Sequence, residues 1–363
     1  MNILFVIPTL QQGGAERVMS ELANEFVNQQ GITVHLVLLA DSKDFYQINK
    51  KVIVHRLGFK NTGKIRKLKS EISTFFKLRN LLKKQKPTAV LSFMEKYNVF
   101  TLLASSFLGL KIFVSDRSNP RTLPPFHIYL LRKFTYKNAA GVIAQTSLAK
   151  EQLWKQTKNN NIKIIPNPLR NVILFPEVPK EKLIINVGRL VPEKGQKYLL
   201  EAFSLLNAPE WKLVILGDGP LLQSLIFQAK KLNILDRLIM PGAVKNVDEW
   251  LARSSIFAFS SISEGFPNAL IEAMAAGLPC VSFDCDAGPR DIIENGRNGF
   301  LVPNADAILL AKKLDEIINN PGIGDHASNI AVNVRTLFSK NKISKDVFNF
   351  ITNHEITQKT HNS

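Results

Sequence analysis

The stretch that decides the fold is Ser255-Ile256-Phe257-Ala258-Phe259-Ser260, followed after three residues by Glu264-Gly265-Phe266-Pro267-Asn268-Ala269-Leu270-Ile271-Glu272-Ala273-Met274. The first run is short and apolar, which predicts a buried strand. Residues 269–276 predict a helix, and Gly265 and Pro267 shape the loop before it. A buried strand that leads into a helix in this way is typical of an α/β domain with a parallel sheet.

The two glutamates of this stretch predict a ligand site. Glu264 falls in the loop and Glu272 falls one or two turns into the helix. The amides at a helix N-terminus bind phosphate readily. Two carboxylates beside such a site suit the hydroxyls of a sugar and a ribose on either side of a diphosphate, which is the shape of a nucleotide-sugar. The alternative interpretation is two ordinary glutamates in contact with solvent, and the residues upstream decide against it.

A second strand, Ile184 to Val187, runs into a glycine loop that holds two cations, Arg189 and Lys194. An arginine fork and a lysine point charge can together neutralise a diphosphate without a metal ion. Two further predicted strands end in the glycine turns Gly217-Asp218-Gly219-Pro220 and Pro241-Gly242. Several strands that end in glycine turns therefore accompany the glutamate pair.

The order G-R-L-x-x-x-K-G, G-D-G-P, P-G and E-G-F-P-N-x-x-x-E-A-M-A resembles the retaining glycosyltransferases of family 4. The resemblance implies the GT-B fold, an α/β architecture of two Rossmann-like doubly wound domains that face a cleft, with a C-terminal helix that crosses back. It implies that Glu264 contacts the transferred sugar, that Glu272 contacts the ribose, and that Arg189 and Lys194 hold the diphosphate. The catalytic residues expected are then Arg189, Lys194 and Glu264. The expected donor-binding residues are Gly13, Gly14, Gly188, Gly217, Gly242, Gly265, Phe266, Pro267, Asn268, Ala269, Leu270 and Glu272.

The resemblance also implies a mechanism, which is front-face substitution with retention, in which the departing diphosphate accepts the proton of the acceptor. We expect no cofactor and no metal, with a nucleotide-sugar, most often UDP-linked, as co-substrate. The donor would supply a hexose or an N-acetylhexosamine. The string Asp284-Cys285-Asp286 spells D-x-D, but three letters match often by chance, and we interpret it as a loop beside the donor site.

The rest of the chain alternates strand and helix patterns, which favours two doubly wound α/β domains. Four prolines between Pro166 and Pro179 indicate a linker. We therefore predict an acceptor-binding domain over residues 1–170, a linker over 171–181, a donor-binding domain over 182–340, and a crossover helix with a tail over 341–363. The strands predicted for the first domain span 2–7, 33–39, 52–57, 89–93, 111–115, 141–145 and 162–165, and its longer helices span 15–29, 66–84 and 123–137.

The acceptor side is predicted from polar residues that follow strands of the first domain. These candidates are Glu95, Asp116, Arg117 and Asn119. Many members of the family that this chain resembles carry a histidine near the second of these positions, where this chain has none, and Asp116, Arg117 or Asn119 could substitute. The Gly13-Gly14 loop follows the first strand, where the resemblance places the diphosphate and the acceptor. It could equally be a plain strand-to-helix turn.

Charge is unevenly distributed along the chain. Residues 1–170 hold 27 Lys and Arg against 9 acids, whereas the remainder is nearly neutral. The segment Lys60 to Lys86 has ten bases and one acid, interleaved with Phe and Leu, and predicts a basic amphipathic helix that contacts an anionic membrane surface. A basic helix with its apolar face on the domain core is the alternative. We expect no nucleic-acid partner, because no recognition motif accompanies the charge.

Composition agrees with an ordinary globular protein, with 45% hydrophobic residues and two cysteines, Cys280 and Cys285, that we expect to be reduced. We expect a cytoplasmic protein at the inner face of the cell membrane whose acceptor is a saccharide or a polyprenyl-pyrophosphate-linked glycan. A dinucleotide oxidoreductase is disfavoured because Gln12-Gly13-Gly14-Ala15 lacks G-x-G-x-x-G. A noncatalytic basic protein that binds membrane or nucleic acid is the remaining alternative, and it leaves the glycine loops unexplained.

Overall fold

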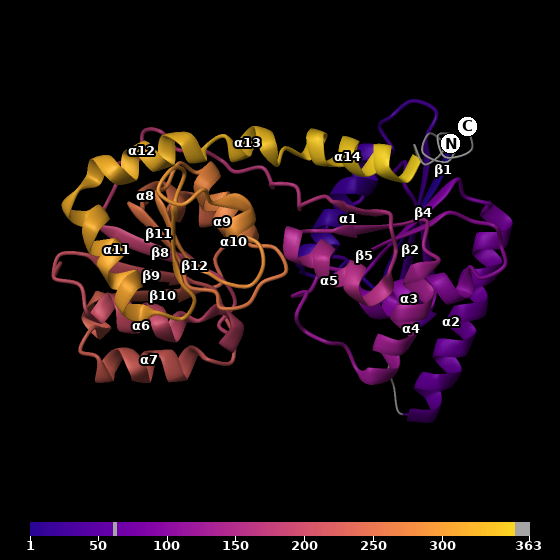
Figure 1. Cartoon of the computed structure of the whole chain (residues 1–363), viewed down its shortest axis with the longest axis horizontal. Coiled ribbons are helices and arrows are strands. Elements are labelled where there is room, and N and C mark those ends of the chain that lie inside the picture. Colours follow the sequence, from indigo (N-terminus) through magenta and orange to yellow (C-terminus); the bar gives the residue numbers. More distant parts are fainter. Residues whose placement is uncertain (61–63, 353–363) are drawn as a thin grey trace. The chain divides into compact units, whose positions relative to one another are not determined.

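A computed structural model describes residues 1–60 and 64–352 of the 363-residue chain. Residues 61–63 of the basic segment and the tail 353–363 lie outside the described residues. Contacts divide the chain into two units (Figure 1), one of residues 1–168 with the C-terminal part from Lys340, and one of residues 169–339. None of the described helices combines the length and the apolar character that a membrane span requires.

The first unit is built on a seven-stranded parallel sheet in the order β3-β2-β1-β4-β5-β6-β7. Its strands are β1 (Asn2–Ile7), β2 (Thr33–Ala40), β3 (Ile53–Phe59), β4 (Ala89–Phe93), β5 (Ile112–Ser115), β6 (Gly141–Ala144) and β7 (Ile162–Ile164). All seven predicted strands are confirmed to within two residues at each end. The central apolar runs form strands because both faces of the sheet are covered, so their side chains are buried whichever way they point, whereas the edge strands β3 and β7 stay largely exposed.

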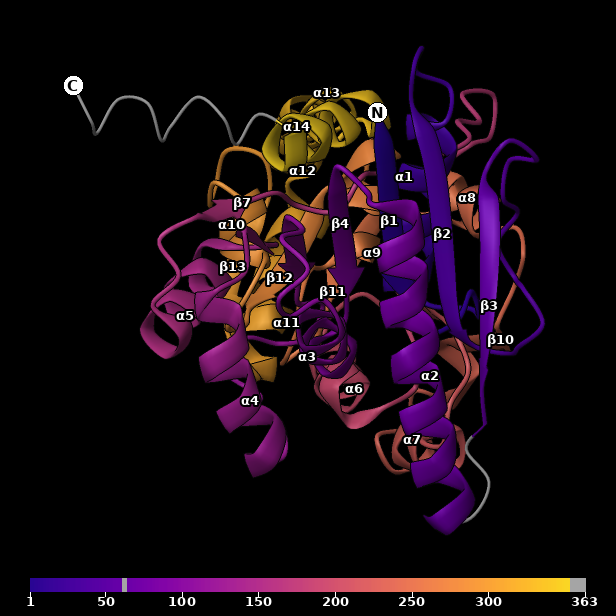
Figure 2. The same cartoon turned by 90° about the vertical axis from the view of Figure 1, so that its right-hand side faces the viewer.

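Helices cover both faces of this sheet. They are α1 (Gly14–Phe26), α2 (Lys64–Gln85), α3 (Glu95–Ala104), α4 (Phe126–Lys137), α5 (Ser147–Thr157) and, in the described part of the tail, α14 (Lys340–Thr352). Ile3, Phe5 and Ile7 share one core with α1 and α14, whereas the alternate residues Leu4 and Val6 share another with α2 to α5. Figure 2 shows α2, α3 and α4 on the same side of the sheet.

The last helix returns to the first unit. Ile343, Val347 and Ile351 of α14 are buried in the core that α1 also lines, and Lys340 Nζ lies 3.6 Å from Glu21 Oε1 of α1. The helix at residues 341–352 is therefore packed on the first unit and belongs to it.

The second unit contains a six-stranded parallel sheet in the order β10-β9-β8-β11-β12-β13. The strands are β8 (Leu183–Val187), β9 (Lys212–Leu216), β10 (Leu238–Gly242), β11 (Ile256–Phe259), β12 (Cys280–Asp284) and β13 (Phe300–Pro303). Its helices are η1 (Pro192–Lys194), α6 (Gln196–Ser204), α7 (Leu222–Lys231), η2 (Leu235–Arg237), α8 (Val247–Arg253), α9 (Asn268–Ala275), α10 (Pro289–Ile292), α11 (Ala307–Asn319), α12 (Pro321–Ala331) and α13 (Val334–Leu337).

The predicted linker is attached to the second unit. The backbone amide of Ile173 donates to Asp248 Oδ2 over 2.9 Å, and Arg253 Nε donates to Glu181 Oε1 over 2.7 Å. Prolines mark this stretch as extended, but these side-chain contacts hold it against α8. Proline spacing identifies a connection between domains, and long-range hydrogen bonds decide which domain the connection follows.

Candidate functional site

Three glycine loops meet at the carboxyl edge of the six-stranded sheet. The amide of Gly188 donates to Leu216 O, and the amide of Gly217 donates to Gly242 O, each over 2.9 Å. Gly217 has φ +144, and a Cβ atom there would lie 1.9 Å from Gly188 O. Only glycine fits such an approach. The structure thus brings the predicted donor glycines 188, 217 and 242 together, at the edge where ligands of such sheets bind.

Lys194 is held at this edge by a turn that also requires glycine. It ends η1, and the next residue, Gly195, has φ +60 and no room for a Cβ, which would lie 2.1 Å from Ser260 O. Ser260 Oγ donates to Lys194 O over 2.9 Å. These contacts fasten the loop after β8 to the loop after β11, so the loop that carries Lys194 is fixed beside the loop that carries Glu264.

Lys194 and Glu264 form an ion pair. Lys194 Nζ lies 2.5 Å from Glu264 Oε1, and the Glu264 side chain is only 8% exposed. The two residues stand 70 positions apart in the chain. A buried carboxylate that keeps a cationic partner avoids the large cost of an unpaired charge. The predicted catalytic pair is therefore brought together, with the ammonium at the more exposed end.

Arg189, the third predicted catalytic residue, lies in the same loop as Lys194 but differs from it in environment. Its side chain is exposed, and in the described part of the chain it makes no ion pair. Its backbone is fixed, because Gln196 Nε2 donates to Arg189 O over 3.0 Å. Gln196 is buried, and its Oε1 has no hydrogen-bond partner among the described residues. Sequence reasoning missed Gln196, although it directly follows the Lys194-Gly195 motif.

The loop from Gly265 to Asn268 is fixed by packing. Phe266 is buried against Phe338, with ring centroids 5.9 Å apart, and Pro267 fills the space where a side chain at Gly288 would stand. Helix α9 begins at Asn268, one residue before the predicted start, and its first amides have no partner within the helix. The Leu270 side chain is fully buried. Its amide already donates to Pro267 O over 3.1 Å, so contact of Leu270 with a nucleotide-sugar stays a prediction, as it does for the backbone amides of Gly265 and Ala269.

Glu272 belongs to a three-residue cluster that sequence reasoning did not find. Arg170 Nε lies 2.9 Å from Glu272 Oε2, and the same guanidinium donates two hydrogen bonds to Asp248, over 2.5 and 3.0 Å. Although burial opposes the charge, bonding to Asp248 and attraction to Glu272 raise the pKa of Arg170. Arg170 ends the first predicted domain, and nothing in its local sequence indicates a partner in α9.

The D-x-D string does not present two open carboxylates. Arg290 donates from Nε to Asp284 Oδ1 over 2.9 Å and from Nη2 to Asp284 Oδ2 over 2.7 Å. Cys285 is buried between the two aspartates, and burial, assisted by nearby Glu264, raises the pKa of its thiol to about 12. Cys280 and Cys285 are both free thiols.

Gly13 and Gly14 lie in the first unit, where α1 begins after β1. Tyr46 Oη donates to Gly13 O over 2.9 Å, and a Cβ at Gly13 would lie 2.2 Å from a Glu16 carboxylate oxygen. The turn is therefore closed by side chains of its own unit, and its predicted contact with the donor stays a prediction.

Two acceptor-side candidates, Glu95 and Asp116, converge on a buried arginine. Arg132 of α4, whose side chain is 7% exposed, pairs with Glu95 Oε1 and lies 3.3 Å from Asp116 Oδ2. Tyr136 Oη donates to Asp116 Oδ1 over 2.5 Å, and Asn98 Nδ2 donates to the same oxygen over 3.0 Å. Burial and repulsion by Asp116 raise the pKa of Glu95 to about 7, against the effect of Arg132. Both carboxylates are thus occupied within their own unit.

The other two acceptor-side candidates are also engaged. The Arg117 guanidinium lies 3.8 Å from the centre of the Phe93 ring, and its Nη1 donates to Asn167 Oδ1 over 2.5 Å. Burial lowers the pKa of Arg117 to about 9. Asn119 Oδ1 accepts the amide of Arg121 over 2.7 Å and so closes a turn. Acceptor binding by these residues remains a prediction.

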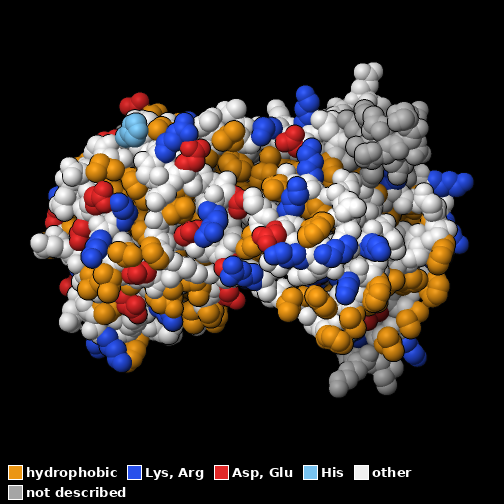
Figure 3. Space-filling model, viewed as in Figure 1, with side chains coloured by type: hydrophobic (Ala, Val, Ile, Leu, Met, Phe, Trp, Pro, Cys, Tyr) orange, Lys and Arg blue, Asp and Glu red, His pale blue; other side chains and the backbone are white. Residues whose placement is uncertain are grey.

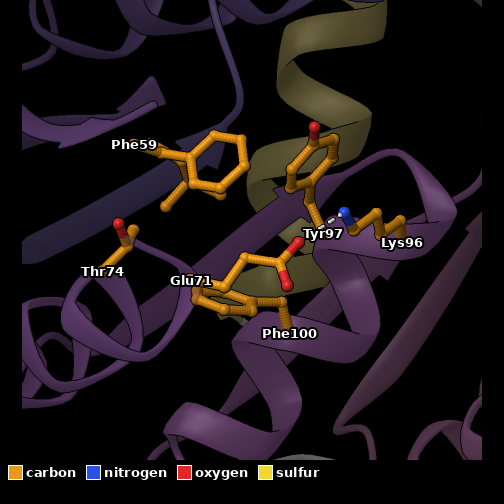
Figure 4. A pocket seen from close by; sticks show the side chains of 7 residues that line it. Phe59, Glu71, Thr74, Lys96, Tyr97 and Phe100 are labelled. Atoms are coloured by element: carbon orange, nitrogen blue, oxygen red, sulfur yellow. Dashed lines mark hydrogen bonds and ion pairs between the residues drawn. The ribbon is translucent and has the colours of Figure 1, made fainter. Parts of the chain in front are cut away.

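A small hollow of about 20 Å³ opens at the carboxyl ends of β2 and β3, between α2 and α3. Figure 4 shows the rings of Phe59, Tyr97 and Phe100 around it, with Glu71 joined to Lys96 at its side. The Lys96 Nζ to Glu71 Oε1 distance is 3.0 Å, and both side chains are partly exposed. Sequence reasoning did not single out this hollow, because its walls come from four separate elements.

Comparison with known proteins adds to this geometry. Residues 12–170 match the family described as Glycosyltransferase Family 4, and residues 174–336 match Glycosyl transferases group 1. An uncharacterized glycosyltransferase of Haemophilus influenzae is 31% identical over 87% of this chain and 90% of its own length.

A second relative is GalNAc-alpha-(1->4)-GalNAc-alpha-(1->3)-diNAcBac-PP-undecaprenol alpha-1,4-N-acetyl-D-galactosaminyltransferase of Campylobacter jejuni. It is 29% identical, over 88% of this chain and 89% of its own. The solved structure of Anabaena HepE in complex with UDP shares the fold, with a TM-score of 0.84 and 17% identity over 97% of this chain and all of that one. This chain therefore belongs to glycosyltransferase family 4 (glycosyl transferases group 1), and it is a glycosyltransferase of the GT-B fold.

Proposed function

We propose that this glycosyltransferase moves a hexose or an N-acetylhexosamine from a UDP-sugar to a lipid-linked saccharide, with retention of the anomeric configuration. The observation that carries the proposal is the Lys194–Glu264 pair at the carboxyl edge of the second sheet, beside exposed Arg189. A diphosphate placed there would meet two cations, and the sugar next to it would meet a carboxylate that can accept its hydroxyls.

In the proposed reaction the bond between the sugar C1 and the diphosphate oxygen breaks while the acceptor oxygen forms a bond to the same face of C1. The departing diphosphate oxygen takes the proton of the acceptor hydroxyl, so no protein base is needed. Arg189 and Lys194 stabilise the charge that develops on the diphosphate, which is the main contribution of the protein together with positioning. Because these cations supply the positive charge, the proposed reaction uses no metal ion and no cofactor.

The names of relatives support the substrate classes. The Campylobacter relative is named for transfer of N-acetylgalactosamine to a glycan on undecaprenyl diphosphate. HepE, which shares the fold, was solved with UDP. On that ground we propose UDP as the nucleotide and a polyprenyl-diphosphate glycan as the acceptor.

Thermal-shift measurements with UDP and a panel of UDP-sugars test the donor site, first in plain buffer and then with EDTA. We expect stabilisation that survives EDTA, because ligand binding raises the free energy of unfolding by mass action. Lys194→Met should abolish the shift. Lys182→Met is the matched control, since Lys182 pairs with Glu210 on the surface of the same unit. Loss of the shift in both variants, or in neither, would contradict the site.

The stereochemical outcome needs a separate measurement. Proton NMR of the newly formed glycosidic bond, with the UDP-sugar that stabilises best and a short-chain polyprenyl-diphosphate glycan, should show an anomeric configuration equal to that of the donor. An inverted product would overturn the front-face mechanism while leaving the donor site intact.

A further inference from the structure

Two buried polar side chains hold the main chain of the loop that carries both cations of the second unit. Gln196 Nε2 donates to Arg189 O over 3.0 Å, and Ser260 Oγ donates to Lys194 O over 2.9 Å. Gln196 is only 1% exposed and Ser260 is fully buried. Each bond therefore joins a side chain inside the domain to the carbonyl of a residue whose charged group lies nearer the surface.

The core does not require an amide at position 196. Leu199 and Leu200, three and four positions further along α6, are apolar and fully buried. Residues at this spacing lie on the same side of a helix as Gln196. Gln196 Oε1 has no hydrogen-bond partner among the described residues, and an unpaired buried acceptor lowers stability. An apolar side chain would therefore suit the fold better, and the bond to Arg189 O is what the amide supplies instead.

A second buried amide supports Ser260. Asn186 of β8 is 3% exposed, and its Nδ2 donates to Ala258 O over 2.7 Å and lies 3.5 Å from Ser260 Oγ. Its Oδ1, like Gln196 Oε1, lacks a partner within the part of the chain that the structure describes. Two incompletely bonded amides in one buried region point to a role other than stability, because folded proteins otherwise pair such groups.

Further bonds fix the main chain around Arg189. The amide of Val191 donates to Arg189 O over 3.0 Å, so this carbonyl accepts two hydrogen bonds, one of them from Gln196. The amide of Leu190 donates to Asp218 O over 2.9 Å. Arg189 thus has a fixed main chain and an exposed side chain, and the direction in which that side chain leaves the loop is set from below.

We propose that Gln196 and Ser260 are positioning residues, which direct Arg189 and Lys194 to the diphosphate of the nucleotide-sugar. A loop that is already in place spares the ligand the cost of ordering it. Acidic and basic side chains are mixed over the face of the second unit that Figure 3 presents, so that face as a whole does not favour an anion. Where the two cations project therefore matters more than the overall charge.

The inference rests on the proposed function, and it adds two residues that lie outside the charged motif. Neither side chain needs to touch the donor, since each acts through the main chain of a cation. The phosphate that UDP has and UMP lacks is the one from which the sugar departs in the proposed reaction. Loss of positioning should therefore weaken UDP binding and spare UMP binding, whereas general damage to the fold would weaken both.

Calorimetric titration of the full chain with UDP and with UMP tests the proposal. Gln196→Met keeps the length of the side chain but removes the amide, and it should lower UDP affinity about tenfold or more while changing UMP affinity less than about twofold. The matched control is Gln228→Met, since Gln228 Nε2 also donates to a main-chain carbonyl of α6, Lys197 O, over 3.0 Å. This variant should change neither affinity.

Ser260→Ala tests the second bond in the same way. It should lower UDP affinity about threefold or more, a smaller loss because the ion pair with Glu264 also holds Lys194. The control is Ser254→Ala. Ser254 is likewise fully buried, and its Oγ donates to a main-chain carbonyl, Trp250 O, over 2.7 Å. Affinity for UMP should stay the same in both variants.

A double-mutant cycle separates positioning from other effects. In an Arg189→Met background, Gln196→Met should lower UDP affinity no further, because the cation that Gln196 positions is gone. An equal loss in both backgrounds would overturn the inference. So would an equal fall in affinity for UDP and UMP, an unchanged UDP affinity in Gln196→Met, or a melting temperature far below that of the wild type.

The wild type and the Arg189→Met variant report on the proposed function itself. Wild-type protein that binds neither nucleotide, or an Arg189→Met variant with normal UDP affinity, would refute the proposed diphosphate site and this inference with it. Normal UDP binding by the wild type, weakened binding by Arg189→Met and no selective loss in Gln196→Met or Ser260→Ala would refute the inference alone.

Discussion

Both units place carboxylates just after strands that end at the carboxyl edge of a sheet and pair them with cations, but the two clusters differ in how exposed those cations are. In the first unit, Arg132 takes up Glu95 and Asp116, and its side chain is almost wholly buried. In the second, the Lys194 side chain is about a quarter exposed, and Arg189 stands in solvent. Similar residue types on similar topology thus form a network of buried, paired charges in the first unit. In the second unit they form a site with exposed cations.

The largest effect on stability should come from removing Arg132, the cation of the buried network in the first unit. Arg132→Met would leave two buried carboxylates without their cation, which should lower the free energy of unfolding by about 3–5 kcal/mol. Urea denaturation of the variant measures this. The control is Lys155→Met, which breaks an exposed pair with Glu151 and should cost at most about 0.5 kcal/mol. An unchanged denaturation midpoint in the Arg132 variant would show that the network is not structural.

Removal of the exposed cation of the second unit, Arg189, should lower the rate of catalysis and leave the stability of the fold unchanged. We expect Arg189→Met to lower kcat by a factor of about 10²–10³, because leaving-group charge loses a stabilising partner in the transition state. Its melting temperature should stay close to that of the wild type, since the side chain is exposed. Steady-state kinetics and calorimetry measure the two quantities, and a large fall in Tm with normal kcat would reverse the distinction between the clusters.

A smaller effect is expected at Glu272, whose carboxylate is already paired with Arg170. Glu272→Gln keeps the shape but loses the charge that would bond to a ribose, so UDP affinity should fall about tenfold or more in calorimetric titration. Asp248→Asn is the informative control, because Asp248 holds Arg170 without being placed at the donor. It should lower Tm and leave UDP affinity nearly unchanged. Equal losses of affinity would mean that Glu272 only positions Arg170.

The smallest effect concerns pH. The folded protein raises the pKa of Glu95 from its ordinary 4.5 to about 7, so the native state holds its proton more tightly than the unfolded chain. The stabilising contribution of this group is therefore complete below about pH 4.5 and is lost as the pH rises towards 7. Melting temperatures of Glu95→Gln should show a shallower fall over this window than those of the wild type. Parallel curves would show that Glu95 does not titrate there.

Much of the candidate site in the second unit could be predicted because its signals are local. Gly217 and Gly195 are required by backbone geometry that a short loop imposes, and Glu264 and Glu272 are separated by one loop and one helical turn. The acceptor side could not be predicted in this way. Glu95 and Asp116 follow strands as expected. Their cationic partner, Arg132, lies 37 positions after Glu95 and 16 positions after Asp116.

The sequence by itself determined two parallel α/β sheets, the loops that carry Lys194 and Glu264, and the family. It could do so because strand and helix periodicity, glycine turns and motif order are properties of neighbouring residues. Only the tertiary structure decided which charges are satisfied. Arg170 reaches Glu272 and Asp248, and Arg132 reaches Glu95 and Asp116, through contacts between segments far apart in the chain. Such contacts depend on where the backbone places each side chain, and no local pattern records that.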